Sequence, residues 1–167
     1  MSYDGLVKQL RLPPGFSPPR RLTFEDLVAT ALTRDDLEDD MRGINSSVDL
    51  IATTRGGGWP EGPVDAEYNY VDLVWHEQEF REGTSFAYVV RDERGAYLGC
   101  CYLYPVGFRT PLSEELIHND VDASWWVTRE AYDRGYYGKL HRALRHWLAE
   151  DFPFRAPHFS NAEVPDL

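Results

Sequence analysis

The residues best suited to chemistry lie between positions 122 and 148. The apolar run "VDASWWVT" leads into "REAYDRGYYG", and the helical pattern "KLHRALRHWLAED" follows. From Arg129 to His146 five basic residues outnumber two acidic ones, in a chain whose formal net charge is −11. A helix N-terminus presents unpaired N–H groups and a positive dipole end, and Gly135 and Gly138 would let a ligand approach the backbone. The stretch favours a cradle for pyrophosphate, with an ordinary solvated helix face as the alternative.

The other candidate catalytic and metal-binding residues give weaker signals. The stretch "HEQEF", which begins at His76, lacks the second histidine of the HExxH zinc motif, so no metal site is expected. Cys100 and Cys101 are adjacent, which fits neither a disulfide framework nor a zinc site. On a strand they would point to opposite faces, one into the core and the other semi-exposed, and a nucleophilic pair of cysteine and histidine is the minor alternative.

Two further groups have both a structural and a functional interpretation. The five tryptophans are expected in the core, with Trp75 and Trp125 as alternative walls of an acceptor pocket. An acidic block after Thr33 forms either a solvated helix face or a field that attracts a cationic amine. The block consists of Asp35, Asp36, Glu38, Asp39 and Asp40.

Length and composition set the class of protein. The 167 residues are 43% hydrophobic and 14% aromatic, which suits one folded domain with a substantial core. The negative net charge argues against nucleic acid as a partner, because phosphate contacts need a basic field. No apolar run reaches the roughly 20 residues of a membrane span, and "MSYDGLVKQLRLPPGF" lacks the order of a signal peptide. We therefore expect a cytoplasmic protein that does not bind membranes.

Proline and glycine divide the first half of the chain into elements. The prolines of "LPPGFSPPRR" predict a leader over residues 1–22 that lies on the domain or frays from it, and residues 23–167 form the domain. A strand is expected over residues 25–33, then a helix with Thr33 as N-cap, then a loop at "TTRGGGWPEGP". A long helix is expected over residues 64–82. Its inward stripe would contain Tyr70, Leu73, Val74 and Phe80.

The second half begins with an alternating pattern. "TSFAYVVRDERGAYLGCCYLYPV" predicts an antiparallel hairpin, in which Gly99 marks a bulge or a close backbone approach. A strand at "VDASWWVT", a polar turn at "REAYDRGYYG", a helix at "KLHRALRHWLAED" and a last short strand within "RAPHFSNAEV" follow. This order predicts an α+β, or mixed α/β, fold with helices on the faces of a central sheet. The last helix should bury Leu140, Ala143, Leu144, Trp147 and Leu148.

From about Leu27 to Asn161 the chain resembles the GNAT N-acetyltransferase superfamily. The stretches that carry the resemblance are "LVATALTRDDLEDDMRGINSS", "FAYVVRDERGAYLGCCYLYPV" and "DASWWVTREAYDRGYYGKLHRAL". It implies the acyl-CoA N-acyltransferase fold, a twisted and mostly antiparallel sheet with helices on both faces. The chain departs from the family in the pyrophosphate loop, where the family has Gln/Arg-x-x-Gly-x-Gly/Ala. Of the three signature positions, here Tyr132, Gly135 and Tyr137, only Gly135 matches, and Gly138 compensates if the loop is shifted by one residue.

The resemblance also implies acetyl-CoA as co-substrate, bound between the fourth and fifth strands of the family's sheet. Backbone groups at Trp126, Val127 and Thr128 would hold the pantetheine arm. Backbone amides of the loop and helix start would then hold the pyrophosphate. These are the amides of Arg134, Gly135, Tyr136, Tyr137, Gly138 and Lys139.

Acetyl transfer needs a base, because a protonated amine is not a nucleophile. Asp122 stands where many family members place a glutamate, and its shorter side chain would act through a water. Tyr137 or Tyr136 would replace the family's tyrosine acid, because the elements that usually follow the fifth strand are absent from this sequence. The sheet edge would then need cover from the leader or from a second subunit in a homodimer.

The sequence therefore predicts an N-acetyltransferase that uses acetyl-CoA and acts on an amine of a small molecule or peptide. The net charge weakly favours a cationic acceptor. One alternative is a GNAT-shaped module that binds CoA or another ligand without turnover, or that regulates a partner. The other is a plain α+β domain without a CoA site.

Overall fold

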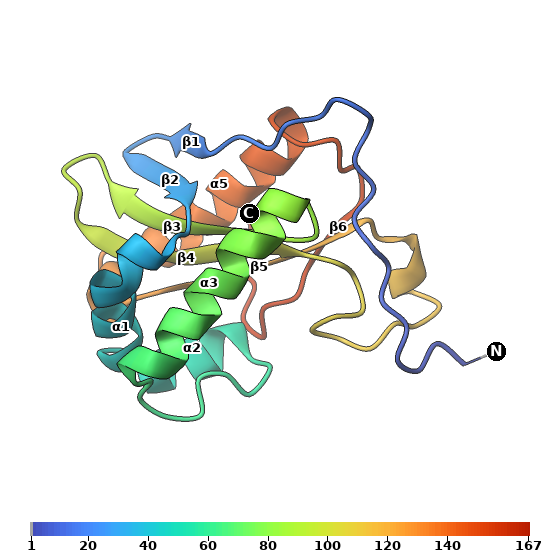
Figure 1. The fold of residues 1–167 in the computed structure, drawn as a ribbon. Helices are drawn as coiled ribbons and strands as arrows, with labels where there is room; N and C mark the ends of the chain where they lie inside the picture. The colour runs from blue at the N-terminus through green and yellow to red at the C-terminus, as the bar shows by residue number, and fades with distance from the viewer. Residues whose placement is uncertain (1) are drawn as a thin grey trace.

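One six-stranded sheet forms the centre of the computed structural model, which describes residues 2–167 (Figure 1). Neighbouring strands are antiparallel from β1 to β5, and β6 runs parallel to β5. Helices cover both faces of the sheet, so the predicted fold class is confirmed. The strands lie in sequence order as β1 (Arg21–Phe24), β2 (Leu27–Ala31), β3 (Phe86–Asp92), β4 (Tyr97–Tyr104), β5 (Val121–Val127) and β6 (Pro157–Phe159).

The first strand is part of a hairpin that the sequence did not predict. Residues 25–33 were expected to form one strand, but Glu25 has a φ of 51° in the turn between β1 and β2. Strand β1 pairs with β2 along its whole length and crosses the expected boundary at residue 22. Its four residues are too few for an alternating pattern to stand out beside the prolines.

The proline-rich leader lies on the domain. Lys8 forms an isolated β-bridge with Val106, beyond the end of β4. Leu10, Leu12 and Phe16 pack against the main hydrophobic core. Burial of these apolar side chains anchors a segment that prolines exclude from regular structure. The division of the chain at residue 22 stays a prediction.

Three helices cover one face of the sheet: α1 (Leu37–Asn45), α2 (Val48–Arg55) and α3 (Ala66–Glu82). Thr33 is an N-cap as predicted, because its side chain accepts from the Asp35 amide while the Asp36 carboxylate accepts from the Thr33 amide. This capping box begins a single 3₁₀ turn (Arg34–Asp36) that leads into α1. The loop predicted at "TTRGGGWPEGP" begins only at Gly56, since α2 takes up its first three residues.

The buried face of α3 differs from the expected stripe. Leu73 and Phe80 are buried as predicted, but the prediction for Tyr70 is wrong, since 41% of it is exposed. Asn69 and His76 face inward instead. Asn69 Nδ2 donates to the buried carboxylate of Asp40 at 2.8 Å, so a polar pair takes the place expected for an apolar residue.

The hairpin of β3 and β4 forms as predicted. The register shifts by one residue after Val90, and Gly99 lies opposite Val90 on one side and Val127 on the other. A β-carbon at Gly99 would collide with the carbonyl oxygen of Trp126. Gly99 therefore marks both a bulge and a close approach of backbone.

Helix α5 (Tyr136–Glu150) packs on the other face of the sheet. The segment before it was expected to be a turn, but it contains the short helix α4 (Arg129–Asp133), capped by the side chain of Thr128. Strand β6 forms within the predicted stretch. None of the helices in residues 2–167 is long and apolar enough to cross a membrane. The predicted stripe of α5 is confirmed, because Leu140, Ala143, Leu144, Trp147 and Leu148 are all buried.

Candidate functional site

The start of α5 has a backbone geometry suited to an anion. Gly135 caps the helix with a φ of 86°, and a β-carbon there would meet nothing within 4 Å. The Gly135 amide bonds back to the carbonyl of Tyr132 at 3.0 Å. The amides of the first helical turn, from Tyr136 to Gly138, have no acceptor within the helix. The predicted residues of the pyrophosphate loop thus form one continuous turn that is open beside Gly135.

Part of the positive charge at this helix start is already paired. Lys139 Nζ contacts Asp26 Oδ1 at 2.8 Å, and the hydroxyl of Tyr136 donates to Asp26 Oδ2 at 2.6 Å. The hydrogen bond from Lys139 lowers the pKa of Asp26, and the bond from Tyr136 adds to this effect. The guanidinium of Arg134 lies 5.1 Å from the centre of the Tyr136 ring. Arg134 remains available to an anion, whereas Lys139 is tied to the turn between β1 and β2.

The edge of β5 beyond β6 is partly covered by a side chain. Strand β6 pairs with β5 only from Val121 to Ala123. Further along, the Asn161 carboxamide accepts from the Trp125 amide at 3.0 Å and donates to the Trp125 carbonyl at 2.9 Å. Main-chain groups alternate between the two edges of a strand, so those of Val127 face the same edge and those of Trp126 face β4. Of the predicted pantetheine contacts, Val127 thus has the main-chain groups on the open edge.

Asp122 is a buried carboxylate, and only one of its two oxygens has a hydrogen-bond partner within residues 2–167. It is 1% exposed, and its Oδ1 accepts a hydrogen bond from Ser160 Oγ at 2.6 Å. Its Oδ2 has no hydrogen-bond partner within residues 2–167. Burial raises the pKa of Asp122, against the opposing effects of the Ser160 hydrogen bond and the charge of Arg109. A raised pKa suits a base that works near neutral pH, although solvent hardly reaches this carboxylate.

Tyr137 lies on the other face of the sheet from Asp122, in the main core. Its hydroxyl donates to the carbonyl of Glu163 at 2.5 Å and accepts from Asn161 Nδ2 at 2.7 Å. Burial raises its pKa to about 12. The phenol is fully hydrogen-bonded, so a role as proton donor stays a prediction that requires the Glu163 contact to open.

A pocket of about 280 Å³ opens beside the Asp122 network, between α3, the loop after α2 and the end of β4. Arg109 lines it and donates to Ser160 Oγ at 2.6 Å, so two hydrogen bonds link this arginine through Ser160 to Asp122. The second arginine in the wall is Arg55, at the C-terminus of α2. The walls are mostly aromatic, with Trp59, Tyr68, Tyr102, Tyr104 and Phe108 among the lining residues.

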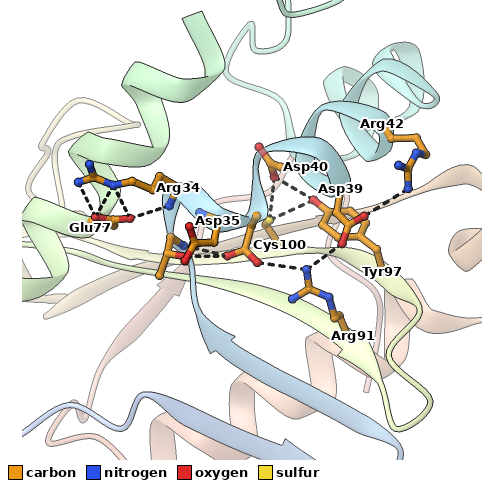
Figure 2. A network of polar contacts seen from close by, with 11 residues as sticks. Arg34, Asp35, Asp39, Asp40, Arg42, Glu77, Arg91, Tyr97 and Cys100 are labelled. Atoms are coloured by element: carbon orange, nitrogen blue, oxygen red, sulfur yellow. Dashed lines mark hydrogen bonds and ion pairs between the residues drawn. The ribbon is translucent and has the colours of Figure 1, made fainter. Parts of the chain in front are cut away.

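The acidic block is less solvated than one interpretation expected (Figure 2). Arg91 bridges Asp36 and Asp39 at 3.1 and 3.0 Å. Asp40 is buried, and its oxygens accept from Asn69 and from the Tyr97 hydroxyl, the latter at 2.9 Å. Part of the block therefore holds α1 against the sheet, which leaves fewer free acids to attract a cationic amine.

The two cysteines point to opposite faces of the sheet, as expected, but both are buried, so the expectation that one of them is semi-exposed is wrong. Cys100 contacts the Asp40 carboxylate and the Tyr97 hydroxyl (Figure 2). Burial raises the pKa of Cys100 and that of Cys101, so both thiols stay protonated at neutral pH. This environment is that of packed thiols and not of a nucleophile.

Neither tryptophan considered as a pocket wall lines the pocket beside Asp122. Trp125 is fully buried and stacks on His141 under α5, and 62% of Trp75 is exposed on α3. The tryptophan in the pocket wall is Trp59, in the Gly/Pro-rich loop. The sequence pattern drew no attention to Arg55 or Arg109, which lie 54 positions apart. The one local signal was the arginine directly before "GGGWPEGP".

No protein-family model and no curated protein sequence matches the chain. Solved structures do match it. The ribosomal-protein α-N-acetyltransferase RimL in complex with coenzyme A has a TM-score of 0.60 at 11% identity, over 79% of this chain and 70% of that one. A ribosomal-protein-alanine acetyltransferase from Vibrio fischeri has a TM-score of 0.54 at 11% identity, over 77% and 66% of the two chains.

A chimera based on the spermidine N-acetyltransferase SpeG from Vibrio cholerae has a TM-score of 0.52 at 16% identity, over 75% of this chain and 65% of that one. The chain thus spans about two thirds of the length of these neighbours. At such low identities the likeness shows the fold. It confirms the acyl-CoA N-acyltransferase fold that the resemblance implied.

Proposed function

We propose that this chain, which has the GNAT fold, is an acetyl-CoA-dependent N-acetyltransferase that acts on an amine of a small molecule or peptide. The observation that carries the proposal is the fold, because the matching structures are acetyltransferases and one of them holds coenzyme A. The open start of α5, which follows β5 after the short helix α4, supports it locally, because Gly135 leaves room for an anion beside the first amides of α5.

The donor would lie along the uncovered end of β5 and over the start of α5. The pantetheine arm would lie along Trp126, Val127 and Thr128 and would bond to the amide and carbonyl of Val127, because the amide of Thr128 bonds to Leu98 on β4. The pyrophosphate would accept hydrogen bonds from backbone amides and from the guanidinium of Arg134 at the start of α5. Among the residues expected from the sequence, Tyr136, Tyr137 and Gly138 would offer their amides and Arg134 its side chain. The amides of Arg134, Gly135 and Lys139 already bond to main-chain carbonyls.

The reaction is a direct transfer within a ternary complex. The amine nitrogen attacks the thioester carbonyl carbon, the new C–N bond forms, the C–S bond breaks, and CoA leaves as a thiolate. Asp122 takes the amine proton through an ordered water, since its buried Oδ2 has no other partner in residues 2–167. Main-chain N–H groups at the end of β5 polarise the thioester carbonyl. The thiolate takes up a proton from water, or from Tyr137 if the bond to Glu163 opens.

One observation favours the alternative, a GNAT-shaped module that binds CoA without turnover. Asn161 already satisfies the main chain of Trp125, so a pantetheine arm has less of the β5 edge to bind than a bare strand would offer. A module would still bind the pyrophosphate at α5, but it would release no CoA thiol when amines are added.

The test is release of free CoA thiol from acetyl-CoA with a panel of amines. The wild type should turn over at least one amine, and Asp122→Asn should lower kcat by about a hundredfold or more, as expected for loss of a general base. Asp49→Asn is the matched control, because Asp49 is exposed on α2 and should leave kcat unchanged. Binding of acetyl-CoA without thiol release would support the module, and neither binding nor release would refute both.

A further inference from the structure

The pocket beside Asp122 has two arginines in its wall and no carboxylate paired with either. Among residues 2–167, Arg55 and Arg109 take part in none of the ion pairs. Charges removed from water are normally paired, because desolvation of an isolated charge is costly. Two unpaired arginines in one pocket, in a chain with a net charge of −11, therefore need an explanation.

Arg55 is 6% exposed. Its Nε and Nη2 donate to Ser124 Oγ at 3.3 and 3.2 Å, which is a neutral acceptor. The guanidinium lies 4.2 Å from the centre of the Tyr102 ring and 5.6 Å from that of Trp59. Stacking fixes its plane, so the remaining N–H groups are held rigidly against the pocket.

Arg109 is half-buried and is likewise held by neutral groups. Its Nη1 donates to Ser160 Oγ, and its Nη2 donates to the carbonyls of Arg55 and Gly56 at 3.2 and 3.0 Å. Burial, together with the positive charge of Arg55, lowers its pKa to about 10. The two guanidinium groups thus repel each other, and an anion between them would relieve that repulsion.

The acids at this pocket, Asp72 in its wall and Asp122 beside it, have other partners. Asp72 lies 3.4 Å from Nε2 of His76 on its own helix, and Asp122 accepts from Ser160. The two arginines are therefore left without a carboxylate partner among the described residues, which points to an anionic ligand that completes the site.

We propose that this pocket binds a carboxylate between Arg55 and Arg109 and a flat apolar group against its aromatic walls, so that the acceptor is an amino acid or a similar aminocarboxylate. A planar carboxylate matches the forked donors of arginine, and about 280 Å³ suits a molecule of that size. The link from Arg109 through Ser160 to Asp122 places the amine near the proposed base. The identity of the acceptor rests on the proposed function, whereas the binding of the carboxylate does not.

Binding is measured on the wild-type protein by calorimetry. The probes are L-phenylalanine, 3-phenylpropanoate, phenethylamine, L-phenylalaninamide and inorganic phosphate. We expect the two carboxylates to bind at least about tenfold more tightly than the amine and the amide. Equal or tighter binding of phenethylamine or the amide, tighter binding of phosphate, or no saturation by a carboxylate up to about 10 mM would overturn the proposal.

Variants test the two arginines. Arg109→Gln should weaken carboxylate binding at least about tenfold, and Arg55→Lys should weaken it by a smaller factor because the charge stays and the planar fork is lost. Arg129→Gln is the control, since Arg129 is exposed on α4 and outside this pocket. Unchanged binding in Arg109→Gln would contradict the proposal. If a variant fails to fold, the comparison of acid with amide on the wild type still decides.

Acetyl transfer separates this inference from the proposed function. Carboxylate binding without thiol release would leave the carboxylate site standing and refute the acetyltransferase activity, and with it the identity of the acceptor. Acetylation of phenethylamine as efficient as that of phenylalanine would keep the enzyme and refute the inference.

Discussion

The side chain of Asn161 pairs with the main chain of Trp125 as a neighbouring strand would. Its carboxamide oxygen accepts from the Trp125 amide at 3.0 Å, and its nitrogen donates to the Trp125 carbonyl at 2.9 Å. The pairing continues the sheet beyond the end of β6, where the chain turns towards α2. There the amides of Ala162 and Glu163 bond to the carbonyls of Arg55 and Thr54. One amide side chain thus connects β5, α2 and the last residues of the chain.

Replacing Asn161 should destabilise the fold. Asn161→Ala would leave the amide and carbonyl of buried Trp125 without partners, which costs about 1–3 kcal/mol of unfolding free energy. Asn161→Asp should also destabilise, because a carboxylate cannot donate to the Trp125 carbonyl. Urea unfolding measures both changes, and a midpoint within error of the wild type in both variants would contradict this account.

Tyr137→Phe separates packing from proton transfer. The variant removes the hydroxyl that bonds to Glu163 and Asn161, so we expect a loss of about 1–2 kcal/mol of stability. We expect kcat to change by less than about tenfold, because the proton of the phenol is held by the Glu163 carbonyl. A fall in kcat of about a hundredfold at unchanged stability would instead establish Tyr137 as the acid.

Gly99→Ala should be among the most damaging small substitutions in the sheet. The added β-carbon would meet the backbone of Trp126 and Val127, which cannot move as a flexible side chain would. Overpacking of this kind costs about 1–3 kcal/mol or more. Gly62→Ala is the matched control, because a β-carbon there meets nothing within 4 Å. Thermal unfolding should show a lower Tm for the first variant alone, and equal Tm values would argue against the close approach.

Asp40 should make stability depend on pH. Burial raises its pKa above 3.8, against the hydrogen bonds from Asn69, Tyr97 and Cys100. The folded state therefore binds a proton more tightly than the unfolded state, and stability falls as the pH rises from about 4 through the raised pKa. The wild type should gain stability relative to Asp40→Asn as the pH is lowered from 7 towards 4. A stability difference that stays constant over this range would contradict the assignment.

The sequence predicted those helices and strands that are long enough for their own apolar residues to show a regular spacing. The stripe of α5 follows directly from the burial of one helix face, and the apolar runs of β3 and β5 fit strands that are buried on both faces. Strand β1 and helix α4 were missed because four or five residues are too few for a periodic signal. The buried face of α3 was misplaced because Asn69 is buried by a bond to Asp40, which lies 29 positions away.

The candidate site was predicted only where local sequence defines it. The Gly135 turn was predicted because a glycine that opens a helix is visible in the sequence. The arginine pocket was not, because Arg55 and Arg109 meet only after the loop that follows β4 folds back onto the end of α2. The pairing of Asn161 with Trp125 was also out of reach, since the sequence predicts a short strand in this stretch but not that a side chain continues its pairing.

Calorimetric titration with acetyl-CoA tests the central claim most directly. The account predicts micromolar binding to the wild type, a loss of about tenfold or more in Gly135→Glu, and unchanged binding in Gly62→Glu, which adds the same charge at another open glycine. Gly135→Ala introduces the same backbone strain as Gly135→Glu but adds no charge, so it should bind acetyl-CoA nearly as well as the wild type. No heat of binding for the wild type at high micromolar acetyl-CoA would contradict the claim that this GNAT fold binds acetyl-CoA.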